Sequence, residues 1–257
     1  MWWGASELLK EREIDEKLKY IGLSLKDVGE PTAINDKEIY MPKKYKKPRL
    51  TDRDIEMITW IAEQNVVRFD TLHEVMTMRY RAIHKSLLYS LCDKWNRMGY
   101  VKKQKFLGDS PTILWATTKA LKLAGFHVKP NERASSPSFS NLLHDCAVSV
   151  VRLEYESRGA SWICERKLRD LMPGNHLPDG LAIYDSARIL VEIDRTKKSK
   201  ARLEMIMSSN ARTPDITCVD YWAPEALVPF IASQIEKLDS SIRSRVRVFQ
   251  LPAGVNL

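Results

Sequence analysis

The sequence lacks a long hydrophobic run. None of its 257 residues belong to a stretch approaching the roughly 18 consecutive apolar residues that a membrane-spanning helix needs. The first residues, MWWGASE, also lack the basic flank and apolar core of a secretory signal. The cysteines are far apart and form no Cys-x-x-Cys pair, which argues against structural zinc and favours reduced, mostly buried thiols (Cys92, Cys146, Cys164 and Cys218). These absences predict a cytoplasmic protein without membrane insertion.

Internal repeats and long low-complexity segments are absent too, so the distribution of charge is the main compositional signal. The net charge is +8, but it is uneven. Residues 1–42 hold six Lys and Arg against nine Asp and Glu, residues 43–129 hold eighteen against eight, and residues 130–257 hold seventeen against sixteen. The excess in the middle third favours a polyanionic partner, although a basic membrane-facing surface would give the same balance.

Residues 50–130 have the element order of a winged helix-turn-helix. Thr51 is placed to cap a helix over residues 52–63, and helical spacing predicts two more helices, over about 69–76 and 80–98. Two strands, 100–106 and 112–116, and a short helix over 119–124 complete the order. The apolar faces that we expect to point inward carry Ile55, Ile58, Ile61 and Ala62 on the first helix and Ile83, Leu87, Leu91, Trp95 and Met98 on the third.

In a winged helix-turn-helix the third helix enters the major groove and the hairpin lies on the flanking backbone. We therefore expect this domain to bind double-stranded DNA, with protein docking as the alternative. The candidate DNA contacts are the basic side chains at the start of the third helix and on the wing: Arg79, Arg81, His84, Lys85, Lys102, Lys103 and Lys105.

The rest of the chain divides around this domain. Residues 1–49 read as a helical and basic extension, and the polar, turn-rich residues 131–140 as a linker. Residues 141–257 then alternate between helix and strand. The expected order is helix 141–157, strands 162–166, 179–184 and 188–194, helix 200–209, strand 216–222, helix 225–238 and strand 246–251. The fold class is thus α+β, with two domains.

The second and third strands of this domain concentrate acids. Asp179 opens one strand, and Glu192 and Asp194 share one face of the next by strand alternation. A hairpin turning at Asp185 and Ser186 brings Asp179 and Glu192 together. Clustered carboxylates in an apolar sheet repel one another unless a cation neutralises them, and oxygen ligands favour Mg²⁺ or Mn²⁺. The predicted metal ligands are Asp179, Glu192 and Asp194.

The strings WICERKL at residues 162–168, LPDG at 177–180 and LVEIDRTKKS at 190–199 resemble two related groups of proteins. With the αβββαβ order they are similar to the restriction-endonuclease-like, PD-(D/E)xK nucleases. With the upstream winged helix they resemble the replication-relaxation family, which includes MOBC-class relaxases of mobilisable plasmids. The resemblance covers roughly residues 50–250. It implies an enzyme that nicks one strand of a plasmid transfer origin in a metal-dependent reaction.

This resemblance implies a catalytic set of His144, Glu165, Asp179, Glu192, Asp194 and Lys197. The sequence departs from the motif at Asp194, where a lysine is usual, so Arg195, Lys197 or Lys198 would have to supply the cation. Each assignment has a structural alternative: His144 as a core histidine, Glu165 as a partner of its basic neighbours, Asp194 as a turn cap.

The attacking group is open between metal-bound water and a tyrosine, with Tyr184 the nearest by sequence. The expected partners are duplex DNA with a locally single-stranded nick site and other relaxosome and conjugative coupling proteins. Two rival functions stay open: a non-catalytic replication or mobilisation accessory protein with a decayed nuclease domain, and a nuclease that cuts both strands.

Overall fold

The computed structural model describes residues 49–105, 111–128, 137–171 and 176–252, all of which belong to one compact unit, Pro48–Leu257. It confirms the α+β class, with two separate sheets. The predicted extension over 1–49, apart from its last residue, and most of the predicted linker over 131–140 lie outside the described residues.

The first half, residues 49–128, packs helices around a small antiparallel sheet. Its order is α2 (Asp52–Glu63), β1 (Val67–Arg68), α3 (Phe69–Arg79), α4 (Lys85–Arg97), β2 (Val101–Gln104), β3 (Ile113–Ala116) and α5 (Thr118–Leu123). The strands lie in the order β1-β3-β2. The short strand β1 was not predicted; it pairs with β3 through Val67 and Leu114. The predicted Thr51 cap is confirmed, and Thr117 caps α5.

The second half, residues 137–252, contains a five-stranded sheet. Its order is α6 (Phe139–Ser157), β4 (Ser161–Cys164), α7 (Glu165–Leu171), β5 (Gly180–Ile183), β6 (Arg188–Ile193), α8 (Lys200–Ala211), β7 (Cys218–Ala223), a 3₁₀ turn (Glu225–Leu227), α9 (Val228–Ile235), α10 (Ser240–Arg243) and β8 (Val246–Gln250). The strands lie in sequence order, antiparallel from β4 to β6 and parallel from β6 to β8. The predicted meander is confirmed, whereas α7 was missed.

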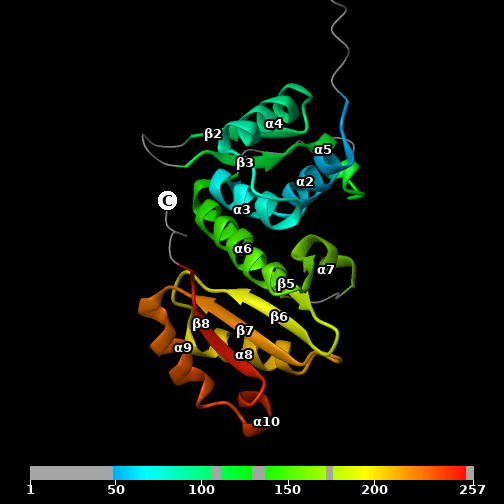
Figure 1. Cartoon of the computed structure of the whole chain (residues 1–257). Helices are drawn as coiled ribbons and strands as arrows, with labels where there is room; N and C mark the ends of the chain where they lie inside the picture. Colours follow the sequence, from blue (N-terminus) through cyan, green and yellow to red (C-terminus); the bar gives the residue numbers. More distant parts are fainter. Residues whose placement is uncertain (1–48, 106–110, 129–136, 172–175, 253–257) are drawn as a thin grey trace, which may run out of the picture. The chain divides into compact units, whose positions relative to one another are not determined.

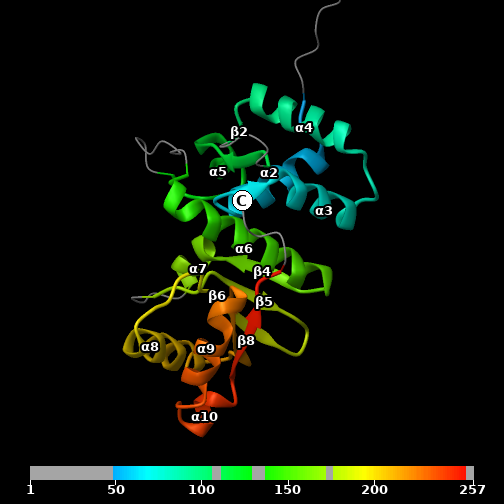
Figure 2. The same ribbon diagram turned by 90° about the vertical axis from the view of Figure 1, so that its left-hand side faces the viewer.

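Helices cover both faces of this sheet (Figures 1 and 2). On one face α6 packs Ala147 and Val151 against Trp162 and Val191. On the other face α8, α9 and α10 bury a second apolar cluster, which includes Leu203, Met207, Ile231 and Ile242. The opposite side of α6 packs on the first half, where Leu142 and Cys146 join Val66 and Ile113. The helix α6 is thus shared by both halves.

Ion pairs strengthen this junction. The Arg152 guanidinium on α6 pairs with Glu63 at 2.8 Å and with Glu156 at 2.6 Å, and lies over the Trp60 ring. Glu156 also accepts hydrogen bonds from the Trp60 indole at 3.1 Å and from Arg79 at 2.8 Å. Because Arg152 and both carboxylates are nearly buried, separating the two halves would strand these charges in an apolar setting.

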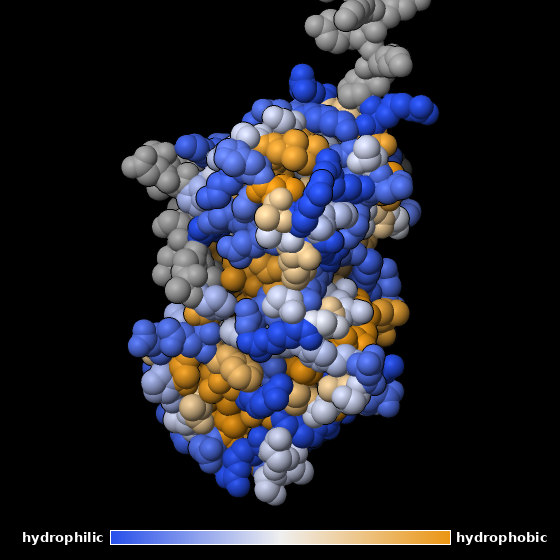
Figure 3. Space-filling view, viewed as in Figure 1, coloured by the Kyte–Doolittle hydropathy of each residue, from blue (hydrophilic) through white to orange (hydrophobic). Residues whose placement is uncertain are grey.

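Two predicted inward positions are exposed instead. The side chains of Ile55 on α2 and Leu87 on α4 are 38% and 45% exposed, and Figure 3 shows hydrophobic residues among hydrophilic ones in the region of α4. The third helix was predicted to begin at Tyr80, but it begins at Lys85, capped by the His84 side chain. Its buried stripe is Leu88, Leu91, Cys92 and Trp95. The predicted stripe was therefore wrong in its first turn.

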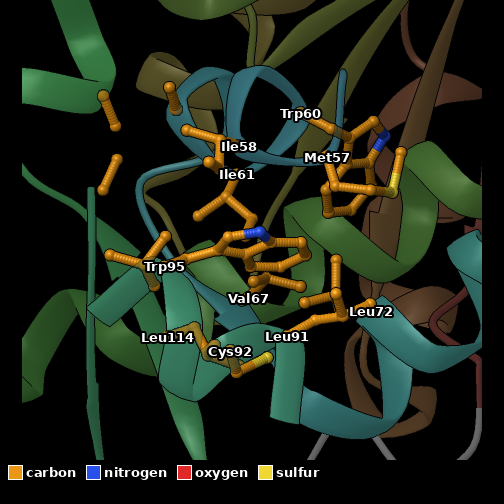
Figure 4. Close-up of a cluster of buried hydrophobic side chains, with 14 of the residues drawn as sticks. Met57, Ile58, Trp60, Ile61, Val67, Leu72, Leu91, Cys92, Trp95 and Leu114 are labelled. Atoms are coloured by element: carbon orange, nitrogen blue, oxygen red, sulfur yellow. The ribbon is translucent and has the colours of Figure 1, made fainter. Parts of the chain in front are cut away.

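The core of the first half gathers around Trp60 and Trp95 (Figure 4). Asp54 accepts a hydrogen bond from the Trp95 indole at 2.9 Å and pairs with Lys94 at 2.6 Å, which ties α2 to α4. Burial alone would raise the pKa of Asp54, but the hydrogen bonds from Lys94, Thr51 and Trp95 outweigh it and lower the pKa to about 2. The charged form of Asp54 is therefore part of the folded core.

The four cysteines are free and buried, as predicted. Within the described part of the chain, no helix is both long enough and apolar enough to cross a membrane.

Candidate functional site

The strand register brings the two predicted acids together. Gly180 on β5 pairs with Val191 on β6, so the next position along the ladder sets Asp179 opposite Glu192. Val191 and Ile193 point into the cluster beneath α6, as expected from strand alternation. Glu192 faces the α8 side and is only 2% exposed. The predicted approach of Asp179 and Glu192 across the hairpin is confirmed.

Asp179 is held by two donors. Its Oδ2 atom accepts a hydrogen bond from the Ile193 backbone N–H at 2.7 Å, and its Oδ1 atom lies 2.9 Å from His144 Nε2. Burial opposes the charged form of His144, but the hydrogen bond and the charge of Asp179 outweigh it and raise the pKa of His144. His144 thus reaches the predicted site from α6 and orients Asp179.

Glu192 is held by two residues that sequence reasoning missed. His176 Nε2 and Asn210 Nδ2 both lie 2.8 Å from its Oε1 atom. Burial and the charge of Asp179 raise the pKa of Glu192, although His176 opposes this; the same hydrogen bond raises the pKa of His176. The position of His176, three residues before Asp179, was the only available signal, whereas Asn210 lies on α8, eighteen residues beyond Glu192.

The cation near the acids is Lys198. Its ammonium pairs with the nearly buried carboxylate of Asp194, four residues earlier. Lys197, the predicted catalytic lysine, instead lies 4.4 Å from the centre of the Phe230 ring. Arg195 donates to the Leu143 carbonyl oxygen at 2.8 Å. Of the three cations that the sequence left open, the structure brings only Lys198 to the acidic side chains.

Glu165 and Tyr184 occupy other places than predicted. Glu165 was expected on a strand, but β4 ends at Cys164 and Glu165 begins α7, where it pairs with Arg169 at 2.9 Å. Its side chain still lines the same hollow as Asp179 and His144. Tyr184 follows the last residue of β5, Ile183, at the opposite end of the hairpin from Asp179. Tyr184 is therefore not placed to attack a phosphate at the acids.

A buried hydroxyl also borders the site. Tyr221 on β7 is the register partner of Glu192, so the two side chains share one face of the sheet. Tyr221 is fully buried, and its hydroxyl has no hydrogen-bond partner among the described residues. Burial, followed by the charges of Glu192, Asp194 and Asp179, raises the pKa of Tyr221 well above its usual value.

The candidate DNA contacts are only partly where they were expected. Arg79 was predicted to face outward on the third helix, but it ends α3 and pairs with Glu56 and Glu156, which tie its guanidinium to the protein. Arg81 lies in the loop before α4, with His84 as the cap and Lys85 as the first residue of α4, and all three are exposed. Lys102 and Lys105 are exposed, whereas Lys103 pairs with Asp93.

The metal prediction finds two close carboxylates rather than a larger cluster. Among the described residues, no group of three or more His, Cys, Asp or Glu side chains is arranged to hold a metal ion. No family model, no curated protein and no solved structure matches the chain.

Proposed function

We propose that this chain binds duplex DNA with its first half and cleaves one strand with its second half, in a reaction that depends on Mg²⁺ or Mn²⁺. On this proposal the first half is a winged helix-turn-helix, with α3 and α4 as the DNA-reading pair and the β2–β3 hairpin as the wing. The second half is a restriction-endonuclease-like domain, whose expected αβββαβ order is present with α7 added after the first strand. The biological role would be nicking at a plasmid transfer origin.

The exposed surface of α4 supports the DNA-binding part. It carries Lys85, Ser86 and Ser90 beside the exposed apolar side chains of Leu87 and Tyr89. Base edges in the major groove offer hydrogen-bonding groups and the thymine methyl group, so a mixed polar and apolar surface suits them. The exposed Lys102 and Lys105 on the hairpin suit the DNA backbone.

This part predicts two different losses of affinity. Alanine at both Arg81 and Lys85 should weaken binding to the preferred duplex about tenfold, because contacts to base edges are lost. Alanine at both Lys102 and Lys105 should weaken all duplexes alike and reduce the slope of log affinity against log salt by about two. Gel shifts with fragments of the DNA flanking the gene, over a range of salt, measure both. Unchanged affinity in both double variants would refute DNA binding by this half.

The observation that carries the cleavage proposal is the pair formed by Asp179 and Glu192. Two carboxylates meet at the end of a largely apolar hairpin, and the pKa of Glu192 is raised even though His176 is its partner. Repulsion of this kind is what a bound cation relieves. An arrangement that served only stability would gain nothing from placing a second acid here.

The residues fit a Mg²⁺ or Mn²⁺ ion of the kind that keeps much of its water shell. Such ions are often bound by one or two carboxylates, and Asp179 and Glu192 supply two. The predicted third ligand, Asp194, already pairs with Lys198. The unpartnered Tyr221 hydroxyl beside Glu192 adds a polar group that a bound water molecule would satisfy. We therefore assign the metal to Asp179 and Glu192.

When bound, the metal would polarise the phosphate and make a water molecule more acidic. His144 and the Ile193 N–H fix the Asp179 carboxylate, and His176 and Asn210 fix that of Glu192. Lys198 would contribute the positive charge that the motif lysine usually provides. Asp194 positions the Lys198 ammonium instead of binding the metal.

A nicking assay tests the proposal. A supercoiled plasmid carrying the gene and its flanking DNA is incubated with the protein and Mg²⁺ or Mn²⁺, with EDTA as the control. Open circles that appear only with metal are expected. Linear product would instead support cleavage of both strands. Intact supercoiled plasmid under every divalent ion would support the non-catalytic accessory protein.

That second candidate function has an observation in its favour. Each predicted acid is already neutralised or hydrogen-bonded within the protein: Asp179 by His144, Glu192 by His176 and Asp194 by Lys198. Such internal pairing is also what a domain without a metal would need. On this reading the chain would still bind DNA through its first half.

The two neighbouring lysines provide a matched comparison. Lys198→Ala should lower the nicking rate at least about tenfold, since it removes the cation beside the acids. Lys197→Ala should change the rate less than about twofold, because Lys197 lies over Phe230. Initial rates are measured below the melting temperature of both variants, because Lys198→Ala leaves a buried Asp194 without its partner. Equal rates in the two variants would contradict the assignment of Lys198.

A further inference from the structure

A cavity of about 330 Å³ opens beside Asp179, where the two halves of the described chain meet. Its walls come from Gln64 and Asn65 after α2, from His144 and Asp145 on α6, and from the start of α7. The cavity is lined mainly by polar side chains, and it adjoins the Asp179–His144 pair on the side away from α8. Nothing in the proposed cleavage of a phosphodiester uses this space.

Gln64 is the feature of the cavity that points to a ligand. The residue is only 2% exposed, yet neither Nε2 nor Oε1 of its amide has a hydrogen-bond partner among the described residues. Buried side-chain amides nearly always have partners, because an unpaired donor or acceptor loses its bonds to water without replacement. A buried amide that lines a polar cavity and has both groups free is therefore ready to bind a ligand.

The chemistry of the lining restricts that ligand. The amide offers one donor and one acceptor side by side, which suits a group with a complementary acceptor and donor on one edge. A phosphate or carboxylate has acceptors only, and would also meet the acids Asp145, Glu165 and Asp179. A simple cation would leave the Nε2 donor unpaired. The edge of a nucleobase has the required pair, as adenine has with N6 and N7.

We propose that this cavity takes one unstacked nucleobase of the DNA strand held at Asp179, with the Gln64 amide hydrogen-bonded to the edge of the base. The inference rests on the proposed function for the position of the strand. Arg166 and Arg169 stand at the same cavity, where guanidinium groups suit the sugar-phosphate chain on either side of the base. Single-stranded segments are commonly recognised through bases turned out of the stack. The cavity would thus select the nucleotide next to the cleaved bond.

Binding of single strands tests the inference without any cleavage. Fluorescein-labelled dA, dC and dT 12-mers, and a 12-mer of abasic units with the same backbone, are titrated with the full chain and followed by anisotropy. Wild type should bind its preferred homopolymer at least about tenfold more tightly than the abasic strand. Gln64→Leu should lower the affinity for that homopolymer to the abasic level. Gln64→Glu, which replaces the donor with an acceptor, should change the order of preference.

Gln234→Leu is the matched control. Gln234 is a mostly buried glutamine on α9 whose amide bonds Ser233, and it does not line this cavity. Its substitution should leave the preference among homopolymers unchanged. Equal affinities of wild type and Gln64→Leu for every strand would overturn the proposal.

Free deoxynucleoside monophosphates, used as competitors, separate the two sources of a nucleobase. Weak competition by all of them supports a base presented by a strand. A monophosphate that competes as strongly as the preferred 12-mer would overturn the assignment to a strand and make a free nucleotide the ligand.

The melting temperature gives a second readout that a structural role would move differently. Leucine removes two unpaired polar groups from the ligand-free protein, so Gln64→Leu should melt no lower than wild type. Melting several degrees lower would show that the amide supports the fold, and the proposal would fail. Neither measurement needs an active nuclease. A chain that never nicks but loses its base preference with Gln64→Leu keeps the base cavity and loses the cleavage proposal; the reverse result separates them the other way.

Discussion

Glu192→Gln should lower the rate of metal-dependent nicking at least about a hundredfold while changing the affinity for duplex DNA by less than about threefold. Glutamine keeps the shape of the side chain on β6 but removes the charge that faces Asp179. Stabilisation of charge at a phosphate depends on the bound metal, so losing one of its two carboxylates should remove most of the catalysis. The DNA-reading residues lie in the first half and should keep their contacts.

Three measurements on the same preparation make this result interpretable. The first is the nicking rate on supercoiled plasmid, the second is duplex affinity by gel shift, and the third is the binding of Mn²⁺, which should be lost. Glu225→Gln, an exposed acid in the turn after β7, is the control and should behave as wild type in all three. If Glu192→Gln nicks as fast as wild type, the proposed active site is wrong.

The stability of this variant separates a binding site from a structural pair. The charge of Asp179 raises the pKa of Glu192, so neutralising Glu192 relieves repulsion while the contact with Asn210 can persist. The metal-free variant should therefore unfold at nearly the denaturant concentration of wild type. A large loss of stability would mean that the ion pair of Glu192 with His176 matters mainly for the fold.

The site could be predicted from sequence where local rules place its residues. Strand alternation and a two-residue turn were enough to set Asp179 against Glu192, because the hairpin register follows from the turn. The choice of Lys198 over Lys197 depends on how the chain bends between β6 and α8, for which no period exists. His176 and Asn210 reach Glu192 from a loop and from a helix far along the chain. Contacts of this kind are tertiary and leave no local pattern.

The same distinction explains the errors in the fold. Helical spacing fits both Leu87-Leu91 and Leu88-Leu91-Trp95, and choosing the wrong first residue turns the face by about 100°, the rotation per residue at 3.6 residues a turn. Packing against α2 through Asp54 selected the second stripe. The helix α7 was missed because residues 162–166 read as one strand, whereas the strand stops at Cys164. Seven residues with one buried side chain, Leu168, give too little periodicity to detect.

Gly180→Ala should destabilise the second half by about 3 kcal/mol, at the upper end of what overpacking costs. A Cβ atom at position 180 would lie 1.9 Å from Cζ2 of Trp162, which is far too close for any two carbon atoms. Trp162 is nearly buried on β4 and packs beside Tyr155, so its indole has little room to move. The glycine after Asp179 is therefore required by the neighbouring tryptophan and not by the backbone, whose φ is not positive here.

A double-mutant cycle tests this cause. Denaturant unfolding of wild type, Gly180→Ala, Trp162→Leu and the double variant gives the cost of the alanine with and without the indole. The cost should shrink to less than about 1 kcal/mol in the Trp162→Leu background, a remainder of the size typical of volume-conserving core changes. An equal cost in both backgrounds would show that the indole is not the obstacle. Because Gly180 adjoins Asp179, any shift of β5 that admits the alanine also moves Asp179 away from Glu192. Nicking by Gly180→Ala should therefore fall even at temperatures where the variant is folded, and Trp162→Leu should restore part of it.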